Sequence, residues 1–395
     1  MNAVRTTPRN LRAFATLLLS ASSLAGCTVQ SDTPFGPDAY GDGGGGADDT
    51  DVEYDGIIAE ADEGGEDGTP PLDPSEEICE THRFDVEANP PEVMLLLDKS
   101  GSMTSNTWQY QGAQVTRWST LHAVTEDVVT TYDASIHFGA LLFPASDAGS
   151  HDFEGMCRMD QTADVEPGAG NATAILDAIP AANEATRGAT PTRAAIELAT
   201  SQLVTSPSEG ARAMVLVTDG LANCADPDDP ARFDDAVRWS VHAAHNQKVQ
   251  TYVIGVDIRD EGDGHTEADA RHELDLVARA GGVPASDDPT KPAFYDATDA
   301  GALYDALDEI AARVECTVTL PGSAAPDATV AVAVDGQAID EVLDCAQDDG
   351  WHFADAEARS QIELCNAACD ALRVTGTVET TQCTPGELEP FYPEP

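Results

Sequence analysis

Four largely apolar runs, each five to eight residues long, constrain the fold of this chain more than any other feature. They occupy residues 93–97, 136–143, 213–217 and 250–256. Runs of this length without alternation are typical of parallel strands buried on both faces. Patterns typical of amphipathic helices lie between and after them, near residues 117–132, 191–204, 231–247, 267–280 and 299–314. This alternation predicts an α/β domain with a doubly wound, mostly parallel sheet.

The charge of the chain excludes one large class of partners. Asp and Glu number 71 against 20 Lys and Arg, which gives a formal net charge of −51. Nucleic-acid binding requires basic surface to neutralise phosphates, so we expect no nucleic-acid partner. An acidic surface instead attracts divalent cations or basic partners.

The first 26 residues predict export. Arg5, Arg9 and Arg12 precede the apolar run 13–19, which is typical of a signal peptide and too short to span a membrane. The following Leu24-Ala25-Gly26-Cys27 resembles the lipobox of bacterial lipoproteins, which implies cleavage before Cys27 and acylation of its thiol. An ordinary signal peptide with a chance cysteine is the alternative. No later stretch is apolar enough to span a bilayer, so a lipid on Cys27 would be the only membrane anchor.

Residues 27–78 are predicted to form an acidic tether. From Thr28 to Ile78 the chain has sixteen Asp or Glu, no Lys or Arg, and a glycine run at 43–46. Such a segment buries too little apolar area to offset its ordering entropy. We expect a flexible spacer that holds a folded head away from the membrane.

Oxygen-bearing side chains follow the buried runs of the α/β domain. Asp98, Ser100 and Ser102 alternate directly after the first run, Thr190 precedes a helix, and Asp219 follows a later run. Because the carboxyl ends of parallel strands meet at one edge of the sheet, we expect these five side chains to converge there. We expect both carboxylates to lie at exposed strand ends. We expect Lys99, which lies between Asp98 and Ser100, to point to solvent. Five hard oxygen ligands with two carboxylates favour Mg²⁺ or Mn²⁺, with Ca²⁺ as an alternative.

Three short motifs over residues 91–314 resemble a known family. Asp98-x-Ser100-x-Ser102, Gly188-Ala189-Thr190 and Thr218-Asp219-Gly220 are similar to the metal-ion-dependent adhesion site of von Willebrand factor type A domains, although Ala189 replaces a frequent glycine. The resemblance implies that Ser100, Ser102 and Thr190 bind the ion directly or through water. It implies that Asp98 and Asp219 mainly orient and neutralise, and that a partner's carboxylate completes the coordination. The lipobox, tether and cysteine-rich tail are similar to bacterial surface lipoproteins that carry this domain.

Cysteine usage fits an oxidising compartment. Nine cysteines minus Cys27 leave eight, and an even number in an exported chain predicts disulfides. They are Cys79, Cys157, Cys224, Cys316, Cys345, Cys365, Cys369 and Cys383. We expect Cys79 to pair with Cys316, across the ends of the α/β domain, and Cys157 with Cys224, in loops near the metal site. Zinc binding by Cys365 and Cys369 is the alternative, although their spacing is not that of a zinc-binding pair.

The last 80 or so residues predict a second, smaller unit. Short strands are expected at 317–320, 329–334 and 372–378, with a hairpin turn at Asp335-Gly336. Five cysteines in this stretch indicate a small β module stabilised by disulfides. The predicted organisation is therefore a signal peptide (1–26), a tether (27–78), the α/β domain (79–314) and a cysteine-rich β module (315–395).

Two classes of function fit these features. The first is a surface lipoprotein of the bacterial envelope, on the outer membrane or cell surface, whose metal ion binds an exposed carboxylate of a protein partner in adhesion or envelope assembly. The second is a metal-dependent hydrolase or an accessory subunit of an enzyme complex. Ser100 lies outside a GxSxG motif, and the sequence shows neither a positioned general base nor a cofactor fingerprint, so we expect a protein that is not an enzyme.

Overall fold

A computed structural model describes most of the chain after residue 77. The described residues are 78–86, 89–110, 112–149, 152–225, 228, 234–258, 269–286, 288–343, 345 and 348–384. The expected signal peptide, Cys27 and nearly all of the expected tether lie outside the described residues. Among the residues that are described, no helix is long and apolar enough to cross a membrane.

A five-stranded parallel sheet forms the centre of the first unit. Its strand order is β5-β2-β6-β7-β8, and all four strand pairings are parallel. The strands are β2 (Glu92–Asp98), β5 (His137–Phe143), β6 (Arg212–Thr218), β7 (Val249–Val256) and β8 (Tyr295–Ala297). The four apolar runs form the first four of these strands. With three residues, β8 is too short to give such a run, which is why the sequence did not indicate it.

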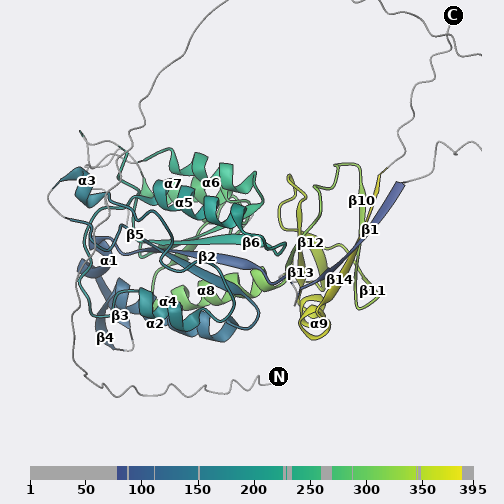
Figure 1. The fold of residues 1–395 in the computed structure, drawn as a ribbon, viewed down its shortest axis with the longest axis horizontal. Helices are drawn as coiled ribbons and strands as arrows, with labels where there is room; N and C mark the ends of the chain where they lie inside the picture. The colour runs from purple at the N-terminus through teal and green to yellow at the C-terminus, as the bar shows by residue number, and fades with distance from the viewer. Residues whose placement is uncertain are drawn as a thin grey trace, which may run out of the picture. The chain divides into compact units, whose positions relative to one another are not determined.

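Helices cover both faces of this sheet, which confirms the doubly wound α/β architecture (Figure 1). One face carries α2 (Arg117–Tyr132), α4 (Ala172–Ala178) and α8 (Ala300–Glu315). The other carries α5 (Thr192–Thr205), α6 (Val237–His245) and α7 (Ala270–Ala280). Side chains of β2 alternate between the two cores: Val93, Leu95 and Leu97 pack on the first set, and Met94 and Leu96 on the second. Burial on both faces explains why the run lacks polar residues.

Short elements surround the carboxyl end of β2. They are α1 (Gly101–Ser105), the hairpin β3 (Thr107–Tyr110) and β4 (Ala113–Thr116), and α3 (Phe153–Met156). The hairpin leads directly into α2, so the first residue of α2 lies close to the end of the sheet where functional residues are expected.

The described part of the C-terminal module consists of two small antiparallel sheets and one helix. One sheet has the order β1-β14-β10-β11 and the other β12-β13-β9. Their bounds are β1 (Ile78–Asp85), β9 (Thr317–Thr319), β10 (Thr329–Val334), β11 (Gln337–Ile339), β12 (Gly350–Phe353), β13 (Gln361–Cys365) and β14 (Thr377–Thr384). Asp335 and Gly336, both with positive φ, form the predicted hairpin turn.

Two expectations for this module are wrong. The segment 372–378 is not one strand: α9 (Ala367–Thr375) runs through its first part, Gly376 ends the helix with a φ of 67°, and β14 follows. β1 pairs with β14 along its whole length, from Ile78 opposite Thr384 to Asp85 opposite Thr377. Residues 79–85 therefore lie in the sheet of the C-terminal module, not in the α/β domain where the sequence placed them.

Four disulfides join the eight expected cysteines. The bonds are Cys79–Cys383, Cys157–Cys224, Cys316–Cys369 and Cys345–Cys365. The expected bond between Cys79 and Cys316 is wrong, because the register of β1 and β14 places Cys79 opposite Cys383. The expected bond between Cys157 and Cys224 is present. Zinc binding by Cys365 and Cys369 is contradicted as well, because each sulfur is bonded to another cysteine.

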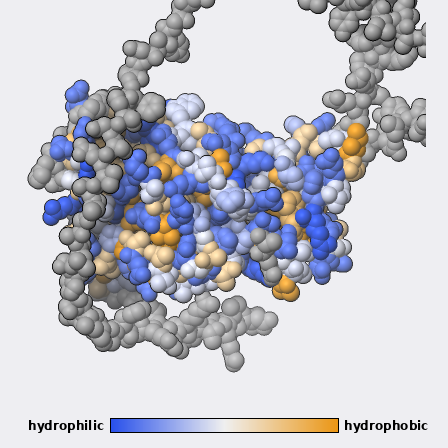
Figure 2. All heavy atoms as spheres, in the orientation of Figure 1, coloured by the Kyte–Doolittle hydropathy of each residue, from blue (hydrophilic) through white to orange (hydrophobic). Residues whose placement is uncertain are grey.

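The C-terminal module contacts the α/β domain at the amino edge of the parallel sheet. Lys248, just before β7, donates from Nζ to the Leu320 carbonyl at 3.3 Å. His245, at the end of α6, forms an ion pair with Asp355. The carboxyl ends of the parallel strands therefore lie at the end of the sheet opposite the C-terminal module. On the face shown in Figure 2, hydrophobic residues form small separate groups among hydrophilic ones.

Candidate metal site

The loop after β2 brings three of the predicted ligands together. The Ser100 amide donates to Asp98 Oδ1 at 2.8 Å, which folds the loop back over the end of the strand. The hydroxyls of Ser100 and Ser102 lie 3.0 Å apart. Thr218, at the end of the neighbouring strand β6, donates its hydroxyl to Asp98 Oδ2 at 2.7 Å. Both oxygens of Asp98 are therefore held, and the two serine hydroxyls point to the same place.

Asp219 reaches the same site from the end of β6. Its Oδ1 accepts a hydrogen bond from the Ser102 hydroxyl at 2.6 Å. Its Oδ2 accepts one from Arg117 Nη1 at 2.7 Å. The structure thus joins Asp98, Ser100, Ser102 and Asp219 in one hydrogen-bonded cluster at the carboxyl ends of two adjacent strands.

Thr190 is held beside this cluster by its backbone. Its amide donates to Asn223 Oδ1 at 2.9 Å, which ties it to the loop that follows Asp219. The preceding Gly188 carbonyl accepts from the Gly101 amide at 3.3 Å. Gly188 has a φ of 104°, and a Cβ there would lie 2.6 Å from Pro144 Cγ, so only glycine allows this close approach. The glycine in the second motif, Gly188, is therefore needed for the loop to pack against the β2 loop.

The two carboxylates are buried, which differs from the expectation of exposed strand ends. Asp98 is 0% exposed and Asp219 is 8% exposed. Burial, together with the charge of Asp219, raises the pKa of Asp98 to about 7. Burial also raises the pKa of Asp219, although the Ser102 hydroxyl and the Arg117 guanidinium oppose the rise. A cation placed between these carboxylates would favour their ionised forms.

The spacing of the oxygens fits a small divalent ion. Mg²⁺ binds oxygens at about 2.0–2.1 Å in an octahedron, so neighbouring ligand oxygens lie about 2.9 Å apart. The separations from Ser100 Oγ to Ser102 Oγ and from Ser102 Oγ to Asp219 Oδ1, 3.0 and 2.6 Å, are close to this value. Hydroxyl and carboxylate oxygens are also the ligand types that Mg²⁺ and Mn²⁺ prefer. The donor set therefore fits such an ion.

The sequence did not indicate several residues of this site. Arg117 and Asn223 both bond to predicted ligands, yet neither belongs to a recognisable spacing. Thr218 belongs to a recognised motif, but the sequence did not indicate that its hydroxyl bonds to Asp98. Asp257, directly after β7, also reaches Arg117, and its position at a strand end was a usable signal. Lys99 is 5% exposed, contrary to the expectation that it points to solvent. Burial lowers the pKa of Lys99, while Asp164 and other nearby carboxylates oppose this shift.

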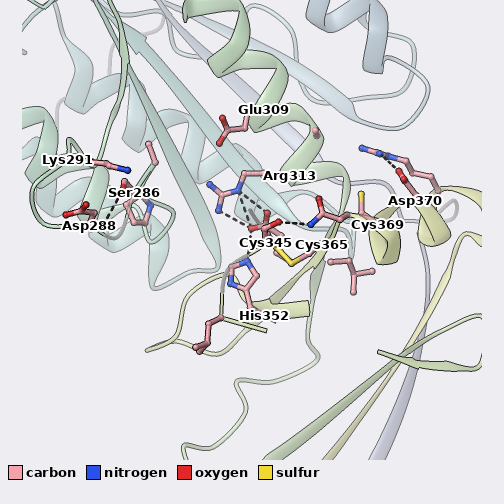
Figure 3. Close-up of a pocket in the computed structure, with 18 residues that line it drawn as sticks. Ser286, Asp288, Lys291, Glu309, Arg313, Cys345, His352, Cys365, Cys369 and Asp370 are labelled. Carbon is pink, nitrogen blue, oxygen red and sulfur yellow. Dashed lines mark hydrogen bonds and ion pairs between the residues drawn. A yellow bond between two sulfur atoms is a disulfide. The ribbon is translucent and has the colours of Figure 1, made fainter. Parts of the chain in front are cut away.

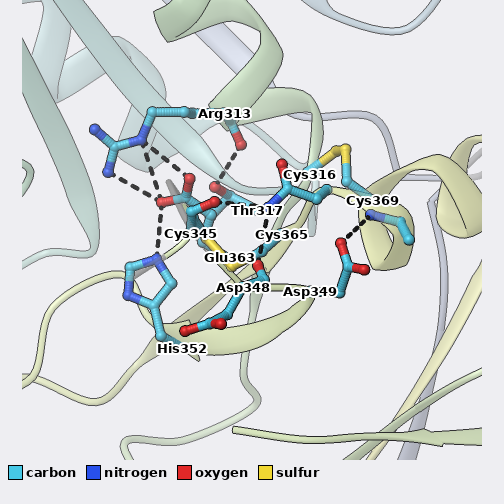
Figure 4. The surroundings of a disulfide bond; sticks show 12 residues. Arg313, Cys316, Thr317, Cys345, Asp348, Asp349, His352, Glu363, Cys365 and Cys369 are labelled. Carbon is cyan, nitrogen blue, oxygen red and sulfur yellow. Dashed lines mark hydrogen bonds and ion pairs between the residues drawn. A yellow bond between two sulfur atoms is a disulfide. The ribbon is translucent and has the colours of Figure 1, made fainter. Parts of the chain in front are cut away.

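A cavity of about 990 Å³ lies between the α/β domain and the C-terminal module, away from this cluster. Figure 3 shows Arg313 from α8 and His352 from β12 converging beside the Cys345–Cys365 disulfide. Glu363 accepts from Arg313 at 3.0 Å and lies 3.4 Å from His352 (Figure 4). The ligand atoms of Cys345, His352 and Cys365 lie within 4.8 Å of one another. Since the two sulfurs are bonded to each other, they are not thiolates and cannot hold a metal in this state.

The fold and the cluster at the strand ends define the class of protein. A parallel sheet covered on both faces, with an Asp-x-Ser-x-Ser loop, a threonine loop and an aspartate loop at one edge, is the arrangement of a von Willebrand factor type A domain. The family model described as von Willebrand factor type A domain matches residues 92–308. The chain belongs to this family. The comparison with curated proteins gave no match.

Solved structures of similar fold come from diverse organisms. The pilus adhesin SpaC of Lactobacillus rhamnosus GG is 15% identical with a TM-score of 0.44, over 75% of this chain and 39% of the adhesin. A von Willebrand factor type A protein of Catenulispora acidiphila is 14% identical with a TM-score of 0.37, over 78% of this chain and 65% of that one. The manganese-loaded TRAP protein of Plasmodium vivax is 17% identical with a TM-score of 0.37, over 60% and 78% of the two chains. The chain thus spans about two fifths of the length of the pilus adhesin, and these similarities concern the fold alone.

Proposed function

We propose that this protein binds a partner through a divalent ion, Mg²⁺ or Mn²⁺, held by Asp98, Ser100, Ser102, Thr190 and Asp219. An exposed carboxylate of the protein partner completes the coordination of the ion. The observation that carries the proposal is the cluster of hydroxyl and carboxylate oxygens at separations of 2.6 to 3.0 Å, at the edge of the sheet away from the C-terminal module.

The charge of the site supports an ion that remains open to a further ligand. Asp98 and Asp219 supply two negative charges, and Arg117 lies 2.7 Å from Asp219 and offsets part of them. The other three donors are neutral hydroxyls. A dication with so little anionic compensation retains affinity for one more carboxylate, whereas a site of four carboxylates would satisfy it.

Binding is favoured over hydrolysis by the partners of Ser100. Its hydroxyl lies 3.0 Å from the Ser102 hydroxyl and also bonds to the Asp98 carboxylate, so both of these partners belong to the proposed ion-binding cluster. The second candidate is a metal-dependent hydrolase or an accessory subunit of an enzyme complex. Turnover of simple esters or phosphoesters that depends on Mg²⁺ and is lost in Asp98→Asn would establish it instead.

We further propose that the protein is exported and held by lipid on Cys27 to the bacterial envelope, on the outer membrane or cell surface. The leader before Cys27 supports this location. The four disulfides support it too, because such bonds persist in oxidising compartments.

The test is retention of the protein by the surface of the producing organism. Purified protein without residues 1–27 is incubated with washed cells in Mg²⁺, in Mn²⁺ or in EDTA. We expect retention in either ion, loss of retention in EDTA, and no retention of Asp98→Asn under any condition. Equal retention of Asp98→Asn and the unchanged protein would contradict the proposed function.

A further inference from the structure

Arg117 forms a buried bridge beneath the candidate metal site. It is the first residue of α2, and its side chain is 4% exposed. Its Nη1 lies 2.7 Å from Asp219 Oδ2, and its Nη2 lies 2.6 Å from Asp257 Oδ2. Nη2 also donates to the Asp257 carbonyl at 3.1 Å. One guanidinium thus joins the aspartates that follow two neighbouring strands, β6 and β7.

This bridge divides the two oxygens of Asp219 between different partners. Oδ1 accepts from the Ser102 hydroxyl at 2.6 Å and belongs to the cluster of predicted ligands. Oδ2 is engaged by Arg117, on the far side of the carboxylate from Ser102. Only one oxygen of Asp219 is therefore directed to the place where an ion would be held.

We propose that Arg117 is a positioning residue that limits Asp219 to one oxygen toward the ion and thereby makes the site prefer Mg²⁺ and Mn²⁺ over Ca²⁺. This inference rests on the proposed function, because it concerns the same ion. Arg117 does not touch the ion and acts through Asp219.

The preference follows from the coordination habits of these ions. Ca²⁺ takes about 6–8 oxygens and often binds both oxygens of a carboxylate, whereas Mg²⁺ takes about six at shorter distances. A guanidinium on Oδ2 prevents bidentate binding by Asp219, which removes one of the extra oxygens that Ca²⁺ needs. The planar fork of arginine suits this task, because it can hold Asp219 and Asp257 at once in fixed directions.

The second anchor, Asp257, fixes the direction of the guanidinium. Asp257 has a φ of 50°, a region that residues other than glycine seldom occupy. In this conformation both its carboxylate and its carbonyl accept from Arg117. Since Arg117 is held at two points, Asp219 cannot turn toward the ion without breaking the bridge.

The test measures ion selectivity, which a merely structural role would leave unchanged. Mg²⁺ and Ca²⁺ are titrated separately by calorimetry into the protein without residues 1–27, with Arg117 intact or replaced in Arg117→Gln. We expect the affinity for Ca²⁺ relative to Mg²⁺ to rise about tenfold in Arg117→Gln, since a bidentate carboxylate adds one oxygen ligand. Arg117→Lys retains a donor for Oδ2 and should keep most of the preference for Mg²⁺. The matched control is Arg193→Gln. Arg193 lies in the first turn of α5, and its replacement breaks an ion pair with Asp234 and should leave the ratio of Ca²⁺ to Mg²⁺ affinity unchanged.

Each outcome decides one proposal. If the unchanged protein binds neither ion, the proposed function fails. If it binds Mg²⁺ but Arg117→Gln loses affinity for both ions in equal proportion, the positioning role fails and the proposed function stands. If circular dichroism shows that Arg117→Gln does not fold, the same titrations are made with Asp257→Asn. That variant keeps the Arg117–Asp219 pair and loosens its anchor, so it should shift the ratio in the same direction but less, and an unchanged ratio would overturn the inference.

Discussion

Asp98 is the residue on which ion binding should depend most. It is fully buried beside Asp219, and both of its oxygens are held by Ser100 and Thr218. Without an ion, two buried carboxylates so close together repel each other.

Asp98→Asn should therefore lower Mg²⁺ affinity by about 100-fold or more, since a site with two carboxylates loses half of its anionic charge. The melting temperature of the ion-free protein should stay the same or rise, because one of two repelling charges is removed. Ser100→Ala should lower the affinity by only about tenfold, since water can replace a neutral ligand. Calorimetry and thermal unfolding measure these effects, and Thr131→Ala on the exposed face of α2 is the control. Unchanged ion affinity in Asp98→Asn would refute the site assignment.

At this scale the sequence predicted which side chains gather at the strand ends but not the residues that support them. Asp98, Ser100, Ser102 and Asp219 could be predicted because parallel strands end at one edge, and the structure brings these four together. Arg117 could not, because an arginine at the start of a helix is ordinary, and only the fold places it under Asp219. Lys99 was misjudged since the sequence does not show that Asp164 lies near it.

Among pairs of elements, α8 and β13 are joined by a largely buried ion pair. Arg313 contacts Glu363 at 3.0 Å, with side chains 21% and 6% exposed. Burial alone would raise the pKa of Glu363, but Arg313 and His352 outweigh it and hold the pKa below its ordinary value of 4.5. Glu363 is therefore ionised at neutral pH and depends on these partners.

Arg313→Met should lower the free energy of unfolding by about 3–5 kcal/mol at pH 7, because it leaves a buried carboxylate without its main partner. Because the pKa of Glu363 is lower in the folded protein than in the unfolded chain, its ionisation stabilises the fold at pH values above the unfolded pKa, near 4.5. This stabilisation is lost as the pH falls through the pKa of the folded protein. The difference between Arg313→Met and the unchanged protein should thus shrink below about pH 4. Urea unfolding across this range measures it. Arg373→Met, which breaks the more exposed pair with Glu315, should cost less than about 1 kcal/mol; an equal loss in both variants would contradict the assignment.

The Cys157–Cys224 bond links the end of α3 to the loop that carries Asn223, the partner of Thr190. Replacing both cysteines by alanine should lower the free energy of unfolding by roughly 2–4 kcal/mol, because the bond closes a long loop in the unfolded chain. The Mg²⁺ affinity should also fall, since Thr190 loses part of its support. Urea unfolding and calorimetry of Cys157→Ala/Cys224→Ala test both statements. A loss of stability without any loss of ion affinity would show that the bond does not support the site.

Long apolar runs and amphipathic helical patterns both predicted elements that the structure contains, whereas β8 was missed and residues 372–378 were misassigned. The runs that became β2, β5, β6 and β7 are buried on both faces, so their composition alone indicates strands. Residues 372–378 mislead because Leu372, Val374 and Val378 alternate like a strand, whereas the helix α9 buries Ala368, Cys369 and Leu372 on one side. The pairing of Cys79 with Cys383 depends on the register of β1 and β14, which their sequences do not specify.

In the molecule as a whole, the C-terminal module contacts the amino ends of the parallel strands, and the candidate metal site lies at their carboxyl ends. β1, which opens the described part of the chain, pairs with β14, which closes it. The chain that precedes residue 78 therefore joins the described part at the module.

If Cys27 carries the proposed lipid, Cys27→Ser should release the protein from membranes, because stable attachment needs several hydrocarbon chains. Membrane fractionation after a high-salt wash measures the release, and Cys27→Ser should still be exported. If this variant remains with the envelope as fully as the unchanged protein, Cys27 is not the anchor.

Whether a bound ion accepts a carboxylate from outside is the most direct test of the proposed function. The protons of water bound to Mn²⁺ relax rapidly. The relaxation rate of water protons therefore reports how many coordination positions of the ion are occupied by water and not by the protein. In the Mn²⁺-loaded protein, added acetate should reduce the relaxation enhancement by displacing water, whereas acetamide, of the same shape but uncharged, should not. Asp98→Asn should show only the relaxation of free Mn²⁺ with either compound. An enhancement that acetate leaves unchanged would contradict capture of a partner's carboxylate by this site.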